Sequence, residues 1–218
     1  MALPTSYECS LHGLVPEHRQ AALLDRLSSL CGGEDARQSL NQHVLGFVPK
    51  SQTPVGPARN DDVVLRLQSN IDESVDTAQR QWALCQYGHP DPHMSTVANT
   101  RPELYSAIHQ GNALQFMDLL GYRYAFELVK EGYWFIYQSQ FEITVSRVYE
   151  LAEQHNLQSK RPKLADGSWL IEVAVHNVHQ DQVKLVPDEL VKFSTYLEGV
   201  AKLENVDYLY MQNKIYYT

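Results

Sequence analysis

The longest regular pattern in the chain is a period-two alternation of apolar and polar residues in GYRYAFELVKEGYWFIYQSQFEITVSRVYEL, residues 121–151. Such alternation is typical of β-strands, because successive side chains point to opposite faces of a sheet. The segments KEG and QSQ interrupt the pattern, which predicts three strands joined by tight turns. Consecutive hairpins of this kind commit the chain to an antiparallel sheet.

Six further segments alternate in the same way and are bounded by Gly, Pro, Asn or Asp, which predicts additional strands. They are residues 7–13, 41–50, 61–70, 81–88, 103–111 and 168–178. The resulting set is larger than a flat single sheet usually carries in a chain of 218 residues. Closure into a barrel removes the exposed sheet edges, so we expect an antiparallel β-barrel of roughly eight strands.

Three segments have the three-to-four residue spacing of helices. The clearest is residues 16–33, where Leu23, Leu24 and Leu27 recur on one side and two glycines follow. Residues 187–205 begin with proline and two acids, and residues 112–121 end at glycine. The expected fold class is therefore α+β, mainly β, with about three helices flanking the barrel.

The chain reads as one barrel domain over residues 1–218, because strand patterns continue on both sides of every break. Segments rich in proline and polar residues predict long loops near residues 50–61, 88–102 and 152–167. Residues 204–218 form a tail beyond the last helix. A chain of this length buries roughly 70% of its unfolded surface without needing disulfides or metals.

Composition narrows the functional classes. The net charge of −8 repels phosphate backbones, so we expect no direct nucleic-acid binding. The three cysteines are an odd number without CxxC spacing, which indicates reduced thiols in a nuclear or cytosolic protein. The first ten residues lack the features of a secretory signal, and no apolar run is long enough to span a membrane.

The first strand, YECSLHG, places Glu8, Ser10 and His12 on one face and three less polar residues on the other. The polar face would suit either the floor of an active site or the inner wall of a barrel. Alternation alone leaves both interpretations open.

Three stretches together resemble the Mediator complex subunit 18 family. They are residues 7–33, residues 112–151 and residues 168–178, and the likeness extends from residue 7 to about 203. Its most specific part runs from Leu114 to Val148, where a short helix, a GY step, an acidic strand end and an aromatic hairpin follow one another.

This resemblance implies a subunit of the Mediator head module, a nuclear coregulator that contacts RNA polymerase II. The family's barrel is similar to that of tunnel-type RNA triphosphatases. The resemblance also implies pairing with Mediator subunit 20, which has a related barrel, and tethering by a C-terminal helix of Mediator subunit 8.

The barrel likeness raises the question of catalysis. Tunnel triphosphatases bind divalent metal through paired inward glutamates, typically Glu-x-Glu-x-Lys on the first strand, because hard cations need several converging carboxylate oxygens. The first strand here offers only Glu8, and two later strands offer only Glu142 and Glu172. A weaker hypothesis collects four glutamates and three arginines in one tunnel: Glu8, Glu127, Glu142, Glu172, Arg66, Arg123 and Arg147. The alternative is that these residues form ion pairs in and around a filled barrel.

Other motifs favour structural explanations. His89 and His93 have zinc-like spacing, but two ligands in a proline-rich loop do not complete a site. The basic segment SKRPK, residues 159–163, is interpreted as a solvated hairpin tip rather than an import signal. The P-loop, GxSxG and HExxH patterns are absent, so we predict no catalytic residues, metal or cofactor.

Two segments are candidate partner-binding surfaces. The tail carries Tyr208, Tyr210, Met211, Ile215 and Tyr216, residue types that interfaces favour, although packing on the chain's own barrel would use them equally well. In the first helix, Leu23 and Leu27 are expected to face the barrel, while a second stripe through Leu24 would receive a partner helix.

Three functional hypotheses follow. The favoured one is a non-enzymatic barrel scaffold that binds a related barrel and a partner helix in the nucleus, supporting RNA polymerase II transcription. The second is a divergent tunnel-type triphosphatase. The third, a small-molecule carrier that uses the barrel interior, rests on barrel geometry alone.

Overall fold

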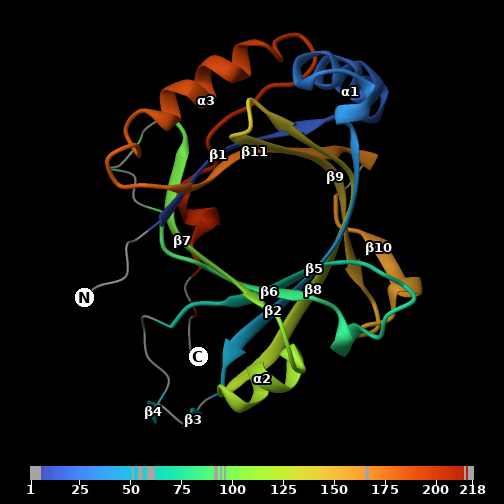
Figure 1. Ribbon diagram of the computed structural model, residues 1–218, viewed down its shortest axis with the longest axis vertical. Coiled ribbons are helices and arrows are strands. Elements are labelled where there is room, and N and C mark those ends of the chain that lie inside the picture. The colour runs from blue at the N-terminus through green and yellow to red at the C-terminus, as the bar shows by residue number, and fades with distance from the viewer. Residues whose placement is uncertain are drawn as a thin grey trace.

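The computed structural model describes residues 6–50, 52–53, 56–57, 62–90, 93, 95, 97–164, 167–213 and 215. Eight strands form a closed antiparallel barrel (Figure 1). In ring order they are β9 (Phe141–Leu151), β11 (Trp169–Val178), β1 (Ser6–Val15), β7 (Asn99–Ile108), β6 (Trp82–Tyr87), β5 (Leu65–Asn70), β2 (Gln38–Pro49) and β8 (Tyr122–Tyr137). The ring closes where β8 pairs with β9. The expected barrel is therefore confirmed.

Among the described residues, three further short strands lie outside this ring. β10 (Lys160–Pro162) extends the sheet along the end of β9. β3 (Gln52–Thr53) and β4 (Gly56–Pro57) pair only with each other. The segment 159–163 is thus a strand of a hairpin with β9 rather than the tip of a hairpin, and Lys160 forms an ion pair with Glu131 of β8.

Three helices flank the barrel, as the spacing predicted. α1 (Glu17–Cys31) ends because Gly32 adopts a left-handed φ of 109°, which glycine allows without strain. At the start of α2 (Ala113–Leu119), the Asn112 side chain accepts a hydrogen bond from the backbone N–H of Gln115. α3 (Val186–Thr195) carries Pro187 in its first turn. It is shorter than predicted, since residues 196–200 form turns and residues 201–203 have no regular structure.

The main apolar core lies on the outside of the barrel. α1 and α3 cover the outer face of β1, β11 and β9 (Figure 1). Outward side chains of β1 such as Cys9 and Leu11 pack there with Leu27 and Phe193. A smaller core forms where α2 packs through Met117 on the outer face of β2, β5 and β6. The helices therefore keep the apolar faces of the strands out of water, and the opposite faces turn inward.

Two details of the strand prediction are wrong. β8 runs without interruption through KEG, so the predicted three strands are two. The predicted loop 88–102 also ends early, because β7 begins at Asn99. Most of segment 50–61 lies outside the described residues. Within the described part of the chain, no helix has both the length and the apolar character needed to cross a membrane.

Candidate functional site

The inward faces of the barrel strands line a polar interior, here called the lumen. On β1, Glu8, Ser10 and His12 face the lumen, because the alternate residues of the strand pack against the helices outside. Glu8 and Ser10 are buried. The polar face of the first strand is therefore an inner wall, and its chemistry depends on its neighbours.

Three lumen glutamates are each bound by a basic group. Arg101 of β7 donates through Nη2 to both carboxylate oxygens of Glu8, at 3.1 and 2.9 Å. Lys130 of β8 reaches Glu172 of β11 at 2.5 Å. The third, Glu103, pairs with Nδ1 of His176 at 2.9 Å. These pairs neutralise the carboxylates that a metal ion would otherwise need.

The pKa directions agree with this pairing. Burial alone would raise the pKa of the Glu172 carboxyl, but Lys130 outweighs that effect and holds the pKa below its ordinary value. Glu103 behaves similarly: its pKa is also lowered, because His176 and the backbone N–H of Asn177 oppose the effect of burial. Both carboxylates are therefore ionised at neutral pH as members of ion pairs.

Two arginines of the lumen share one aromatic ring. The guanidinium carbon of Arg101 lies 3.8 Å, and that of Arg66 lies 5.3 Å, from the ring centroid of Tyr87 on β6. Burial, together with the neighbouring Arg101 charge, lowers the pKa of Arg66. Stacking of this kind stabilises partly desolvated guanidinium groups. Arg101 is thus held in place by Tyr87 and Glu8, and Arg66 stacks on the same Tyr87 ring.

Among the described residues, one group has the composition of a metal site: Glu8, Glu103 and His176 bring ligand-type atoms within 4.8 Å of one another. A metal there would need a neutral imidazole nitrogen and free carboxylate oxygens. The protein's own side chains occupy these atoms, with Arg101 on Glu8 and His176 Nδ1 on Glu103. The donor set therefore fits an ion-pair cluster better than a cation site. His89 and His93 are not part of this group.

The predicted collection of four glutamates and three arginines does not form. Glu8, Glu142, Glu172 and Arg66 belong to the inward faces. Glu127 instead lies on the outward face of β8, where it pairs with Leu45 of β2. The other two residues are also outside the lumen: Arg147 pairs with Glu17 of α1, and Arg123 is exposed.

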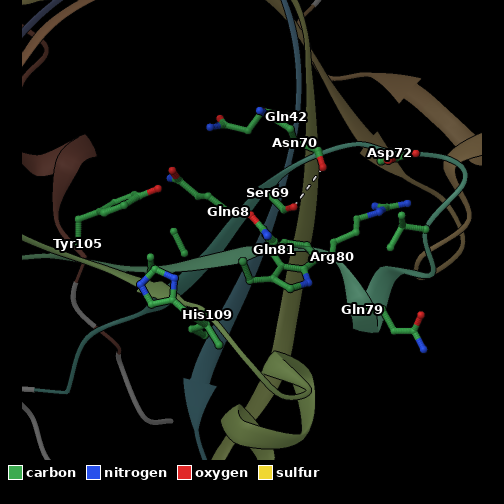
Figure 2. Close-up of a pocket in the computed structure, with 15 residues that line it drawn as sticks. Gln42, Gln68, Ser69, Asn70, Asp72, Gln79, Arg80, Gln81, Tyr105 and His109 are labelled. Carbon is green, nitrogen blue, oxygen red and sulfur yellow. Dashed lines mark hydrogen bonds between the residues drawn. The ribbon is translucent and has the colours of Figure 1, made fainter.

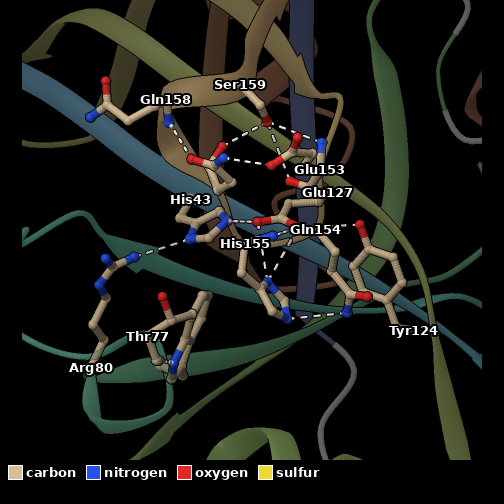
Figure 3. A network of polar contacts seen from close by, with 12 residues as sticks. His43, Thr77, Arg80, Tyr124, Glu127, Glu153, Gln154, His155, Gln158 and Ser159 are labelled. Carbon is tan, nitrogen blue, oxygen red and sulfur yellow. Dashed lines mark hydrogen bonds and ion pairs between the residues drawn. The ribbon is translucent and has the colours of Figure 1, made fainter.

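Outside the barrel, Glu127 is the centre of a buried polar network (Figure 3). It accepts hydrogen bonds from Nε2 of His43 at 2.6 Å, from the backbone N–H of His155 at 3.0 Å and from the Tyr124 hydroxyl at 3.2 Å. Arg80 lies 3.1 Å from Nδ1 of His43. The network ties the 152–159 loop and the segment before β6 to strands β2 and β8.

Sequence reasoning missed this network. The available signal was that His43 and Glu127 occupy the same alternating positions as the buried Leu45 and Val129. A histidine and a carboxylate in a buried register need partners, because an unpaired buried charge is costly. That signal requires knowing which face of each strand is covered.

The C-terminal tail crosses one end of the barrel. Glu204 and His12 of β1 exchange backbone hydrogen bonds of 2.9 and 2.8 Å. The Asn99 side chain makes two hydrogen bonds with the backbone of Val206, at 2.6 and 2.7 Å. Asn213 is buried and donates to the carbonyl oxygens of Val64, at 2.7 Å, and Tyr87, at 3.0 Å. These contacts follow the ring order β1, β7, β6 and β5.

The predicted tail residues divide into three groups. Tyr208 and Tyr210 are exposed, and Tyr210 reaches 85%. Met211 and Ile215 are half-buried, and Tyr216 lies outside the described residues. The tail thus packs on its own barrel through its backbone and the Asn213 side chain while displaying two tyrosines.

The three α1 leucines predicted to contact a partner or the barrel are all buried. Leu23, Leu24 and Leu27 belong to the core between α1 and the barrel, and Leu24 is only 1% exposed. The second stripe expected to face away from the barrel is therefore part of the same core. The cause is that α1 packs into one core with the outward residues of β1, β9 and β11 and with Phe193 and Leu197 of α3 and the turn after it.

The Asn213→Ala variant is expected to loosen the tail. Losing both donated hydrogen bonds leaves two carbonyls without their partner, so unfolding free energy should fall by about 1–2 kcal/mol. Backbone amides of residues 204–213 should exchange with solvent faster. Tyr210→Ala, in the same segment but exposed, is the control and should change neither quantity. Unchanged amide exchange in Asn213→Ala would contradict this anchoring role.

The His176–Glu103 pair predicts a loss of stability in mild base. Burial alone would lower the pKa of His176, but the hydrogen bond and charge of Glu103 outweigh it and raise the pKa from 6.5 to about 9. A raised folded-state pKa contributes stability that is complete below pH 6.5 and disappears as pH rises through about 9. His176→Gln should therefore be less stable than the native chain at pH 6, and the gap should close by pH 10. An exposed His18→Gln control should show no such closing gap, and a constant offset for His176→Gln would refute the assignment.

The chain was compared with protein families and with curated proteins, and both comparisons found a match. The family model described as Med18 protein matches residues 7–214. A curated relative, Mediator of RNA polymerase II transcription subunit 18 from Yarrowia lipolytica, is 27% identical over 135 residues, which make up 60% of this chain and 56% of the relative. The chain thus spans just over half the length of that relative in the alignment.

Solved structures share the barrel. A chain from the Schizosaccharomyces pombe Mediator head module aligns with a TM-score of 0.75 and 23% identity, covering 92% of this chain and 98% of that one. The RNA triphosphatase domain of a mimivirus mRNA capping enzyme aligns with a TM-score of 0.54 and 9% identity, covering 89% and 90%. At these identities the comparison establishes the fold alone, and it confirms the expected likeness to tunnel-type triphosphatase barrels.

Proposed function

This chain belongs to the Med18 protein family, and from that premise we propose that it is a non-catalytic scaffold subunit of the Mediator head module. The observation that carries the proposal is the family match over residues 7–214, which includes every strand of the barrel. The S. pombe head-module chain, aligned over nearly its full length, supports the same assignment. A role in RNA polymerase II transcription, and with it a nuclear location, follows from membership of that complex.

We further propose two direct partners, Mediator subunit 20 and the C-terminal helix of Mediator subunit 8. The candidate contact surface is the tail, where Tyr208 and Tyr210 are exposed beside the barrel end. Tyrosines bury a large area while keeping a polar group, so they are favoured at interfaces. In α1, Leu23, Leu24 and Leu27 would contribute by holding the helix in position, because their side chains are already buried. The single domain proposed for residues 1–218 would present these contacts from one barrel.

The lumen argues for a scaffold over a triphosphatase. A catalytic tunnel needs carboxylates free to hold metal and bases free to hold phosphates. Here Arg101 is committed to Glu8 and Lys130 to Glu172. This pairing stabilises the barrel wall. It also leaves these carboxylates unavailable to bind a metal ion, and these basic groups unavailable to bind a phosphate.

The test is coexpression with Mediator subunit 20 and the subunit 8 helix, followed by size-exclusion chromatography with light scattering. A one-to-one-to-one complex is the expected result. The double variant Tyr208→Ala with Tyr210→Ala should weaken it, whereas an exposed change elsewhere, Leu119→Ala on α2, should not. Failure of the tagged chain to copurify any Mediator head subunit from nuclear extract would contradict the proposal.

The triphosphatase alternative is tested separately. Purified chain at high concentration is incubated with inorganic or nucleoside triphosphate and with magnesium or manganese, and phosphate release is measured. We expect none. Release that disappears in Glu172→Gln or Glu142→Gln would establish the enzymatic alternative.

A further inference from the structure

The two ends of the barrel differ. The tail crosses the end formed by the start of β7, the end of β6 and the start of β5. The opposite end carries two neighbouring pockets, with volumes of about 650 and 250 Å³. Both pockets are lined by Gln42, Gln68 and Tyr105, which come from three different strands. Figure 2 shows these side chains around one space. The lumen is therefore accessible from this end.

Amide side chains make up a third of the lining of the larger pocket, five of fifteen residues. Gln42, Gln68, Asn70 and Gln81 all contribute to its wall (Figure 2). An amide group can donate and accept hydrogen bonds simultaneously, which is what the backbone of an extended peptide requires. This lining suits a peptide segment better than an apolar ligand.

The smaller pocket leads inward to Glu142. Among the described residues, no cation is recorded within ion-pairing distance of its carboxylate, unlike Glu8, Glu103 and Glu172. The charge of Glu142 acts on His176, but Nδ1 of His176 is hydrogen-bonded to Glu103. Glu142 is therefore partly buried and has no directly paired cation among the described residues.

The acidic lining residues and the exposed aromatic ring at this end of the barrel favour binding of a cation. Glu103, Glu142 and Asp72 line the two pockets, against His176 and Arg80, and the Arg80 guanidinium is turned to His43. The Tyr105 ring is 63% exposed at the rim. An aromatic face beside a carboxylate binds ammonium and guanidinium groups by combining cation–π attraction with charge-assisted hydrogen bonds.

We propose that the open end of the barrel binds an extended segment of a partner protein and takes one lysine or arginine side chain of that segment between Tyr105 and Glu142. The amides of Gln42 and Gln68 bond the segment's backbone. The site is separate from the tail surface and from the Mediator assignment, because it uses only groups at the opposite end of the barrel.

The test uses the full chain and a pair of short extended peptides that differ only at one residue, arginine in one and the neutral isostere citrulline in the other. Binding is measured by calorimetry and by chemical-shift changes at Glu142 and Tyr105. The citrulline peptide should bind about tenfold more weakly, which corresponds to the loss of one charged contact. Equal binding of the two peptides, or binding of neither, overturns the proposal.

Two variants locate the site. Glu142→Gln removes the charge with little change of shape and should weaken the arginine peptide about tenfold while leaving the citrulline peptide unchanged. Glu198→Gln makes the same charge change at an exposed position after α3 and should have no effect. A loss of affinity that is equal in both variants would reflect net charge alone and refute the site.

A final arm distinguishes the source of the cation. Agmatine carries the guanidinium without a peptide backbone, so it cannot use the amides of the larger pocket. It should bind more weakly than the arginine peptide. Agmatine binding as tightly as the peptide would make the site a receptor for a free amine and would overturn its assignment to a partner segment.

Discussion

Replacing Glu127 by alanine should lower the free energy of unfolding by about 3–5 kcal/mol, the cost of breaking a buried charged network by removing one partner. The side chains of Glu127 and His43 are 1% and 0% exposed. Without the carboxylate, the donors of His43, His155 and Tyr124 lose their acceptor, and the His43 donor is cut off from water. Each buried donor left unsatisfied adds to the penalty.

Urea unfolding monitored by circular dichroism is the measurement. Glu150→Ala on β9 removes a carboxylate from an exposed position and should change stability by no more than about 0.5 kcal/mol. Hydrogen exchange should also quicken in residues 152–159, since this loop is fastened through His155. If Glu127→Ala matched Glu150→Ala in stability, the network would not be holding the loop.

The same network predicts acid sensitivity. Burial alone would raise the pKa of Glu127, but hydrogen bonds from His43 and His155 outweigh it, so the pKa lies below the ordinary value of 4.5. A lowered folded-state pKa contributes stability that is present above pH 4.5 and lost as pH falls through the folded pKa. Glu127→Gln should consequently flatten the stability curve on the acid side, measured from pH 6 down to pH 3.

Alternation in the sequence was sufficient to predict the barrel but not its inside and outside. The pattern of β1 separates Glu8 and Ser10 from Cys9 and Leu11, and either set would satisfy a period of two. The choice is made by α1 and α3, whose apolar faces cover Cys9 and Leu11 from outside. Long-range packing of helices that are distant in sequence therefore decides that the glutamates face inward.

The position of Glu127 could not be predicted for a related reason. Glu127 and Lys130 lie three positions apart on β8, so alternation places them on opposite faces, with Glu127 outside the barrel and Lys130 inside. Alternation does not say which of the two faces is inward. The tunnel hypothesis grouped Glu127 with the lumen glutamates because the sequence alone does not show that the 152–159 loop contacts the outer face of β8 at this residue.

The false break in β8 has a simpler cause. KEG was interpreted as a turn because glycine often ends a strand, but glycine also occurs where two backbones approach closely. Gly132 is such a place: it pairs with Ser146 of β9 and lies against the backbone of Val145. The φ angle of Gly132 is not positive, so this position does not need glycine for a turn conformation.

Gly132→Ala should accordingly be among the most damaging single changes in the barrel, destabilising it by about 3 kcal/mol or more. An added Cβ would overlap the carbonyl oxygen of Val145 and come within 2.9 Å of the Ser146 Cα, and neither backbone atom can move without disturbing the β8–β9 pairing that closes the ring. Gly46→Ala is the matched comparison, because the three atoms nearest to its Cβ would all belong to the ring of Phe126, a side chain that can turn aside, rather than to a neighbouring backbone.

Urea unfolding of both variants should therefore rank Gly132→Ala below Gly46→Ala, with a gap of at least about 1 kcal/mol. A conformational penalty cannot produce this ranking, since neither glycine has a positive φ. The gap isolates the cost of forcing apart two strands at the seam of the barrel. Equal stability of the two variants would mean that the β8–β9 seam yields as readily as a single side chain, and that closure of the ring is not what fixes Gly132.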